Sequence, residues 1–281
     1  MSVSLQGLIQ CPECRGRLAT SDGRHRCMQC ARSYVIEDGI HVLLPADSQE
    51  QAPFYDDPEY RKYMDQMDLL HFEHYRPGSL TGRIERDVKR RMARLVQGAI
   101  PPFVDLGCGT GQGFAMLGAD EDIIGVDNNM DLLRHCRKLH PNATLVCCDM
   151  RRSPFVAQAF QIMFSIGTLE HVFHLESFVE SASFSLAESG RFYVEVPTEG
   201  GILWALGRLL LTSRRNSRLL GVDYSRVIKM DHCNTVFAVQ NALEKHFIIE
   251  ELLQYPFGFG GPHCNVAFMY RLRKRSFRSS I

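Results

Sequence analysis

The chain has 281 residues, of which 45% are hydrophobic, so it can bury one substantial core and carry a small additional module. Its 32 lysine and arginine residues balance its 32 aspartate and glutamate residues. This zero formal charge excludes a strong overall attraction to nucleic acid or to an anionic membrane, while local charged patches stay open. No stretch is apolar and long enough to span a bilayer, and residues 1–8 lack the pattern of a signal peptide. The sequence therefore favours a cytoplasmic protein.

Two Cys-x-x-Cys pairs lie near the start of the chain and consist of Cys11, Cys14, Cys27 and Cys30. Such pairs can place four thiolates tetrahedrally around one Zn²⁺, and four cysteines leave no open coordination position. We therefore expect one structural zinc ion per chain. A redox-active Cys-x-x-Cys is disfavoured because the surrounding βαβ pattern is missing. Residues 33–45 read as two short strands around an Asp-Gly turn, which completes a zinc-binding domain over residues 1–45.

Residues 46–83 carry linker chemistry, with prolines among acidic and amide side chains at their start. Residues 60–75 mix aromatic, methionine and charged side chains. We expect a helix there that either covers a ligand as a lid or, more simply, packs against its neighbours. Residues 84–97 show an apolar stripe at helical spacing and predict a helix that packs beneath a sheet. Its Lys-Arg-Arg run is read as a solvated face rather than as a contact with RNA.

Residues 103–111 form a short apolar run that ends in Gly107, Gly109 and Gly111. A buried strand that leads into glycines lets a ligand lie against the backbone, which is typical of nucleotide sites. Dinucleotide folds use Gly-x-Gly-x-x-Gly, but Gln112 stands where the third glycine should be, so a nicotinamide cofactor is disfavoured. Twenty residues after Gly107, a second apolar run ends in Asp127, an acid placed to accept hydrogen bonds from ribose hydroxyls.

Apolar runs and helical patterns alternate from residue 102 onward. Strands are expected near 102–106, 122–126, 143–147, 160–165 and 190–196, with helices near 112–118, 130–139 and 175–187; residues 247–253 and 266–272 supply two further strands. This alternation predicts an α/β fold with a parallel sheet wound on both faces and a ligand beyond the carboxyl ends of its strands. Acidic residues stand at those ends, namely Asp105, Asp127, Asp149 and Glu170.

The order and spacing of these motifs resemble the class I S-adenosylmethionine-dependent methyltransferases over roughly residues 84–271. Their first motif matches residues 104–111, their ribose-binding acid matches Asp127 and their adenine-contacting acid matches Asp149. Residues 164–171 are similar to the small-molecule and lipid O-methyltransferases, in which a Glu-His pair is common. The resemblance implies a Rossmann-like, seven-stranded sheet with helices on both faces in a domain over residues 84–281. The cofactor-binding residues that it implies are Asp105, Gly107, Cys108, Gly109, Gly111, Asp127, Asn128, Asp149, Met150 and Gly167.

The N-terminal segment resembles the small zinc-ribbon partner proteins of RNA and release-factor methyltransferases. It is also similar to the ribbon fused to some large-subunit rRNA guanine methyltransferases.

Methyl transfer to a hydroxyl needs a group that removes its proton, and His171 is the best candidate because imidazole titrates near neutral pH. A substrate hydrogen bond or a place at a helix start is an equal alternative for this residue. Glu170 either orients His171 or contacts the cofactor. His232 is a second candidate, since residues 231–234 resemble an acidic-His-x-Asn segment of lipid and sugar methyltransferases; its alternative role is structural. Positioning alone, with no general base, also stays open.

An insert is expected at about 198–245. Residues 202–211 are apolar almost all round and precede Arg214, Arg215 and Arg218. We favour a buried cap helix with a solvated basic end; the alternative is a helix within 202–218 that rests on a membrane surface, with its arginines at the headgroups. An apolar lid suits a lipid, polyketide, quinone or lipid-linked sugar better than a flipped polar base.

The sequence thus predicts a zinc-ribbon domain joined to a methyltransferase that uses S-adenosylmethionine on a small or lipid-like acceptor, at oxygen. An rRNA or tRNA methyltransferase is the first alternative, and it predicts a continuous basic surface from the ribbon to the pocket. A non-catalytic scaffold that binds S-adenosylmethionine, and whose ribbon docks another protein, is the second.

Overall fold

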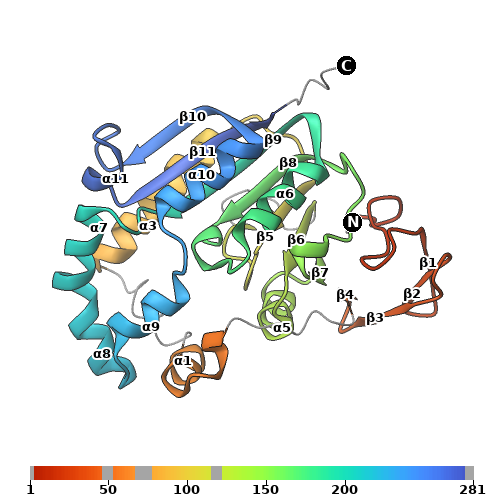
Figure 1. Cartoon of the computed structure of the whole chain (residues 1–281), viewed down its shortest axis with the longest axis horizontal. Helices are drawn as coiled ribbons and strands as arrows, with labels where there is room; N and C mark the ends of the chain where they lie inside the picture. The colour runs from red at the N-terminus through yellow and green to blue at the C-terminus, as the bar shows by residue number, and fades with distance from the viewer. Residues whose placement is uncertain (1–2, 46–52, 67–77, 115–121, 276–281) are drawn as a thin grey trace.

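The computed structural model describes residues 3–45, 53–66, 78–114 and 122–275, and its strands form one sheet with helices on both faces (Figure 1). The described strands follow the order β1-β2-β3-β4-β7-β6-β5-β8-β9-β11-β10. Their bounds are β1 (Leu18–Ser21), β2 (Arg24–Cys27), β3 (Ser33–Glu37), β4 (Ile40–Leu43), β5 (Phe103–Leu106), β6 (Ile123–Asp127), β7 (Thr144–Cys148), β8 (Phe160–Ile166), β9 (Leu186–Pro197), β10 (Phe247–Tyr255) and β11 (Ala267–Lys274).

Seven of these strands, β7-β6-β5-β8-β9-β11-β10, form the sheet that the sequence predicts. Strands β7, β6, β5, β8 and β9 pair in parallel, and β11 runs antiparallel between β9 and β10. Strand β9 begins at Leu186 rather than near residue 190. A side chain at Gly190 would meet the carbonyl oxygens of Gln161 and Ala187 at 2.9 and 3.0 Å, so this glycine permits close strand packing.

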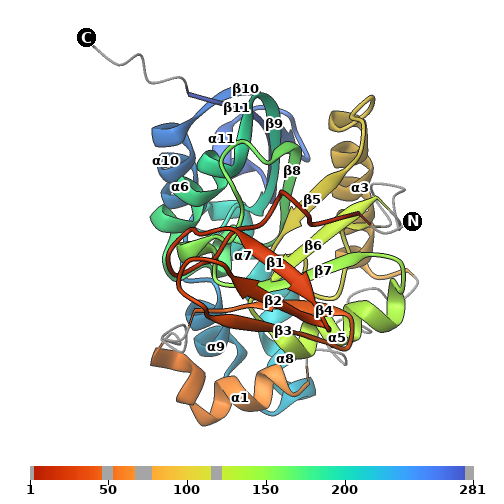
Figure 2. The ribbon, with the colours of Figure 1, turned by 90° about the vertical axis from the view of Figure 1, so that its right-hand side faces the viewer.

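Helices cover both faces of the sheet (Figure 2). Helices α3 (Leu80–Leu95) and α5 (Met130–Leu139) bury Val88, Met92 and Leu133 against one face. Helices α6 (Leu175–Ser185) and α10 (Val236–His246) pack on the other. Helix α3 begins four residues before the expected position because the Ser79 side chain accepts a hydrogen bond from Gly82 N. The predicted helix near 112–118 falls mostly outside the described residues.

The N-terminal strands β1 to β4 form an antiparallel ribbon that continues the central sheet. Strand β4 pairs in parallel with β7, with Ile40 opposite Leu145 and Leu43 opposite Cys148. The guanidinium of Arg137 on α5 also donates to the carbonyl oxygen of Gly39, in the turn between β3 and β4. Strands from the two predicted domains, 1–45 and 84–281, therefore share one sheet.

The insert between β9 and β10 is helical, and α1 (Pro58–Met64) packs against it. It contains α7 (Ile202–Gly207), the π-helical η4 (Arg208–Ser213), α8 (Arg214–Leu220) and α9 (Tyr224–Asp231). Tyr60 and Tyr63 of α1 share a small core with Leu220, Val227 and Ile228. The 60–75 helix ends at Met64, and its expected continuation over 67–75 lies outside the described residues.

The favoured interpretation of the insert as a buried cap is wrong for its first turns, because α7 buries none of its side chains. Apolar residues on every side of a helix indicate burial only where another element covers each face. Here one face of α7 stays open to solvent.

The remaining elements are short. They are η1 (Pro53–Asp56), η2 (Met150–Arg152), η3 (Leu169–His171) and α11 (Gly261–Cys264). Across the described residues, the helices are all too short or too polar to cross a membrane.

Candidate active site

The glycine turn after β5 is held against the end of β8. Gly107 has a φ of +80°, and a Cβ atom there would lie 2.0 Å from Thr168 Cγ2. The Thr168 hydroxyl donates to the carbonyl oxygen of Gly107 at 3.0 Å. Gly109 also has a positive φ, and no atom lies within 4 Å of the position of its missing Cβ. The turn thus leaves open backbone beside Gly109, where a ligand can approach closely.

Two acids at the strand ends border this turn. Asp127 Oδ2 accepts from Gly109 N at 2.9 Å, and Oδ1 accepts from Asn129 N at 2.9 Å. A carboxylate oxygen has two lone pairs, so both oxygens can still accept from ribose hydroxyls. Asp105 is 2% exposed, and its Oδ1 has no hydrogen-bond partner among the described residues. Burial, together with the charge of Asp127, raises the pKa of Asp105 to about 7.

The predicted adenine-contacting acid, Asp149, is engaged by its own neighbour. Its Oδ1 accepts from Arg151 N, and its Oδ2 accepts from Arg151 Nε at 2.8 Å. An adenine at this place would have to share Asp149 with the guanidinium.

The structure places the other predicted cofactor residues around the same strand ends. Cys108 and Met150 are buried, while Asn128 is exposed. Gly167 has a φ of +58°, and its backbone N–H donates to the carbonyl oxygen of Glu195 at 3.0 Å.

The two candidate histidines meet beyond β8. The rings of His171 and His232 lie perpendicular, with centroids 4.7 Å apart. His171 Nδ1 is 3.1 Å from the carbonyl oxygen of Asp231 and 3.3 Å from its Oδ2. Both are acceptors, so Nδ1 carries a hydrogen, and Nε2 can accept a proton once His171 is in its neutral form. Tyr60 and Tyr63 hold Asp231 by donating to its two carboxylate oxygens at 2.9 and 3.2 Å.

This arrangement separates the pKa values of the pair. Burial opposes the charge of His171, but the Asp231 carboxylate outweighs it and raises the pKa of His171 to about 9. Burial likewise opposes the charge of Asp231, and the nearby His171 lowers the pKa of Asp231 to about 2. The two groups therefore form an ion pair at neutral pH.

Glu199 connects His232 to the insert. Its Oε2 lies 3.2 Å from His232 Nδ1 and accepts from Trp204 Nε1 at 2.7 Å. Arg208 donates to both Glu199 oxygens. Burial opposes the ionisation of Glu199, yet the hydrogen bonds from His232 and Trp204 lower the pKa of this carboxyl group. Trp204 also stacks along the His232 ring at a centroid distance of 6.4 Å, so the insert helix borders the histidine pair.

Glu170 is 4% exposed and lies next to His171 in η3. Its Oε2 has no hydrogen-bond partner among the described residues, while Oε1 lies 3.7 Å from His171 Nε2, too far for a hydrogen bond. Asn234 fixes the η3 turn that carries both residues, since its amide donates to the carbonyl oxygens of Leu169 and Val172 at 2.9 and 2.7 Å. An unpartnered buried carboxylate is costly, so this position suits a ligand that donates hydrogen bonds.

The four N-terminal cysteines also come together. Their sulfur atoms all lie within 4.8 Å of one another, with Cys11 and Cys30 3.7 Å apart and Cys14 and Cys27 3.4 Å apart. Tetrahedral zinc with Zn–S bonds of about 2.3 Å separates its ligands by roughly 3.8 Å. The backbone N–H groups of Gln29 and Cys30 point to Cys27 Sγ at 3.4 Å. The donor set fits a zinc ion.

Sequence reasoning missed several residues of the histidine centre, among them Asp231, Glu199 and Tyr60. Asp231 had a signal, because it directly precedes His232 in the segment already singled out. Glu199 also had one, since it follows β9 at the carboxyl edge of the sheet. Tyr60 had none: it lies 171 positions from Asp231 and reaches it only through the packing of α1 on the insert.

Residues 103–190 match a family model described as a methyltransferase domain. The chain is a methyltransferase. Its cofactor is S-adenosylmethionine, and the open glycine turn with Asp127 at its side fits that ligand.

Solved structures match this methyltransferase at low sequence identity. The PH0226 protein of Pyrococcus horikoshii is 18% identical with a TM-score of 0.51, and the match covers 72% of this chain and 99% of that protein. An S-adenosylmethionine-dependent methyltransferase of Mesorhizobium loti is 18% identical with a TM-score of 0.45, covering 65% and 96%. No curated protein matches the chain.

Proposed function

We propose that this methyltransferase methylates an oxygen atom of a small, lipid-like acceptor, with His171 as the general base. The observation that carries the proposal is the place of His171. It stands beyond β8, next to the glycine turn, with Asp231 on its Nδ1 and an apolar insert helix close by. S-adenosylmethionine supplies an electrophilic methyl group, and the acceptor hydroxyl must lose its proton.

The hydrogen bonding of His171 suits proton removal. Asp231 accepts from Nδ1 and thereby fixes the tautomer whose Nε2 can accept a proton, while the two tyrosines hold the carboxylate in place. The side chain of His171 is 37% exposed, so an acceptor can reach it. The pKa of His171 is about 9, so its imidazole is mostly protonated at neutral pH. A cationic ligand nearby destabilises the imidazolium and thereby increases the fraction of neutral imidazole, which is the base. His232 and Glu170 are proposed to position the acceptor and the cofactor.

The surroundings favour an apolar acceptor. Trp204 lies along the His232 ring, and the helix that carries it exposes apolar side chains to solvent.

The alternative as an RNA methyltransferase is less favoured. The ribbon of β1 to β3 lies at the opposite end of the molecule from α7 and α8 (Figure 1). Its exposed arginines, which include Arg17, Arg24 and Arg26, are thus far from the insert that borders the histidine pair. We propose that the four cysteines hold one structural zinc ion that stabilises this ribbon.

The test uses methyl-labelled S-adenosylmethionine with a membrane lipid extract and, separately, with total RNA. Label is expected in the lipid fraction, in an O-methyl product identified by mass spectrometry. His171→Gln should abolish most of this transfer while leaving cofactor affinity intact, and His246→Gln, at the far end of α10, is the matched control. Label in RNA alone, or full transfer by the His171 variant, would overturn the proposal.

A further inference from the structure

A large apolar surface lies on the insert side of the molecule. Its side chains are between 47% and 76% exposed, and they are Ile202, Leu206, Leu209, Leu210, Leu211, Phe237, Phe257 and Phe259. Ile202, Leu206, Leu209 and Leu210 repeat at helical spacing, so they line one face of the helix formed by α7 and η4. Exposed apolar surface of this extent is unusual on a soluble protein and marks an interaction site.

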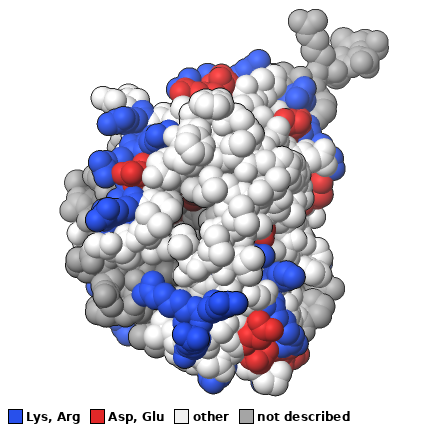
Figure 3. Space-filling view, turned by 90° about the vertical axis from the view of Figure 1, so that its left-hand side faces the viewer, with Lys and Arg blue, Asp and Glu red and all other residues white. Residues whose placement is uncertain are grey.

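These side chains belong to one continuous surface. Helix α11 touches α7 so closely that a Cβ atom on Gly201 would lie 2.2 Å from the carbonyl oxygen of Pro262. The rings of Phe237 and His263 are 5.7 Å apart, and those of Phe257 and Phe259 are 6.4 Å apart. Figure 3 looks onto this side: uncharged atoms fill its middle, which is hollowed near the centre, and basic side chains gather at two margins.

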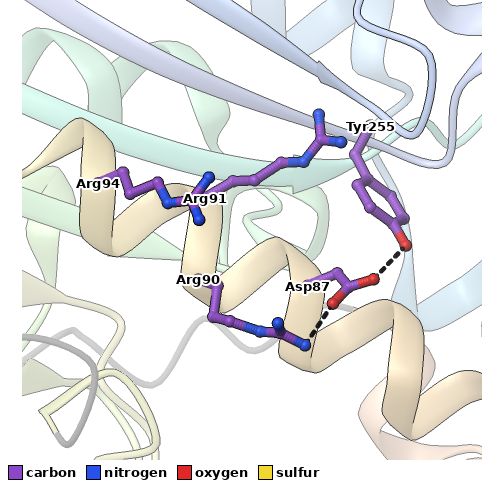
Figure 4. A pocket seen from close by; sticks show the side chains of 5 residues that line it. All are labelled: Asp87, Arg90, Arg91, Arg94 and Tyr255. Carbon is purple, nitrogen blue, oxygen red and sulfur yellow. Dashed lines mark hydrogen bonds and ion pairs between the residues drawn. The ribbon is translucent and has the colours of Figure 1, made fainter.

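Arginines form both basic margins. Arg214, Arg215 and Arg218 of α8 are exposed beyond the end of the apolar helix. The other margin is a recess of about 220 Å³ lined by Asp87, Arg90, Arg91, Arg94 and Tyr255 (Figure 4).

The recess has a surplus of positive charge and is tied to the apolar surface. Asp87 is its one acid, and this carboxylate accepts from Arg90 at 2.6 Å and from the Tyr255 hydroxyl at 3.1 Å. Arg91 lies over the Tyr255 ring at 4.9 Å and donates to the carbonyl oxygen of Pro256, the residue before Phe257. The packing of Arg91 thus fixes the base of the loop that carries Phe257 and Phe259.

We propose that this face docks onto an anionic lipid bilayer. The leucines and phenylalanines insert at the boundary between headgroups and acyl chains, the recess of α3 binds a lipid phosphate, and the arginines of α8 contact neighbouring headgroups. Apolar side chains flanked at two margins by arginines match the charge and polarity of an anionic membrane surface. An RNA partner would instead need positive charge across the middle of the face.

Docking in this way also gives the acceptor a route. The helix that carries Leu209 and Leu210 also carries Trp204 and Arg208, which bond Glu199 beside His232. A lipid-like acceptor that leaves the bilayer at this helix therefore starts close to the histidine pair. This route rests on the proposed function, whereas the docking face does not.

The test is co-sedimentation of the full chain with vesicles of phosphatidylcholine alone or mixed with phosphatidylglycerol. We expect binding to the mixed vesicles and much weaker binding to phosphatidylcholine. Leu209→Glu with Leu210→Glu should weaken binding by about a hundredfold, because two leucines lose their burial in the bilayer. Ile100→Glu is the control, since Ile100 is 77% exposed and Leu210 is 76% exposed.

Charge is tested separately. Arg90→Glu with Arg94→Glu should weaken binding to the mixed vesicles by about tenfold or more and leave binding to phosphatidylcholine unchanged; Lys138→Glu on α5 is the control. Equal binding of the leucine variant and its control, or capture of RNA in place of vesicles, would overturn the docking face. Calorimetry with S-adenosylmethionine on the same variants separates this outcome from failure of the proposed function, because cofactor binding should stay unchanged in all of them.

Discussion

The close contact between Gly107 and Thr168 gives a sharp prediction for Gly107→Ala. The new methyl group would stand 2.0 Å from Thr168 Cγ2, on a backbone with a φ of +80°. The left-handed backbone costs about 1–2 kcal/mol for alanine. Relief of the overlap adds about 1–3 kcal/mol, because Thr168 must move and lose its hydrogen bond to the carbonyl oxygen of Gly107. The total loss in the free energy of unfolding is about 2–5 kcal/mol.

Gly98→Ala provides the matched control. Gly98 has a φ of +88°, but no atom lies within 4 Å of the position of its missing Cβ. Its substitution should therefore cost only the backbone strain of about 1–2 kcal/mol. The difference between the two variants measures the overlap at Thr168.

Urea denaturation of both variants, and of a double-mutant cycle with Thr168→Ala, measures these quantities. Thr168→Ala removes Cγ2 and should recover about 1–3 kcal/mol in the Gly107→Ala background. Loss of no more stability in Gly107→Ala than in Gly98→Ala would refute the reasoning, as would a coupling energy near zero.

Asp127→Ala should weaken S-adenosylmethionine binding by about ten- to a hundredfold through lost charge-assisted hydrogen bonds, and unchanged affinity in calorimetry would contradict the ribose assignment. Cys11→Ser should release one zinc ion per chain and lower the melting temperature; metal analysis that finds no zinc in the parent chain would remove this claim. The pKa of about 9 for His171 predicts that kcat/KM rises with pH up to about 9, and Asp231→Asn should move the midpoint to lower pH. The raised pKa also implies that the stability contributed by His171 is complete below its unfolded pKa of about 6.5 and is lost as pH rises through 9. Over this pH range, the urea midpoint of the parent should therefore fall more than that of His171→Gln.

The central sheet was largely predictable because its signals are local. Strands β5 and β6 each read as an apolar run that ends at a polar turn, and the spacing from Gly107 to Asp127 sets the unit between them. Helix α5 began where Asn129 caps it. The prediction thus succeeded where neighbouring residues decide the structure.

The misses concern contacts between distant segments. Nothing in residues 40–43 says that this strand pairs with β7, because a hairpin strand can equally remain in its own ribbon. Helix α7 reads as buried, and only the position of its neighbours leaves one side open. Likewise, Asp231 is held by two tyrosines of α1. In the sequence, α1 comes before β5 and Asp231 comes after β9, so the two are far apart along the chain.

The pairing of β4 with β7 covers an edge strand of the central sheet. A bare β7 would present unpaired backbone groups at an open edge, a template for self-association. Chelation of the proposed zinc ion, by loosening the ribbon, should therefore promote aggregation through this edge as well as melt the N-terminal strands. Metal content would in this way govern the solubility of the whole enzyme.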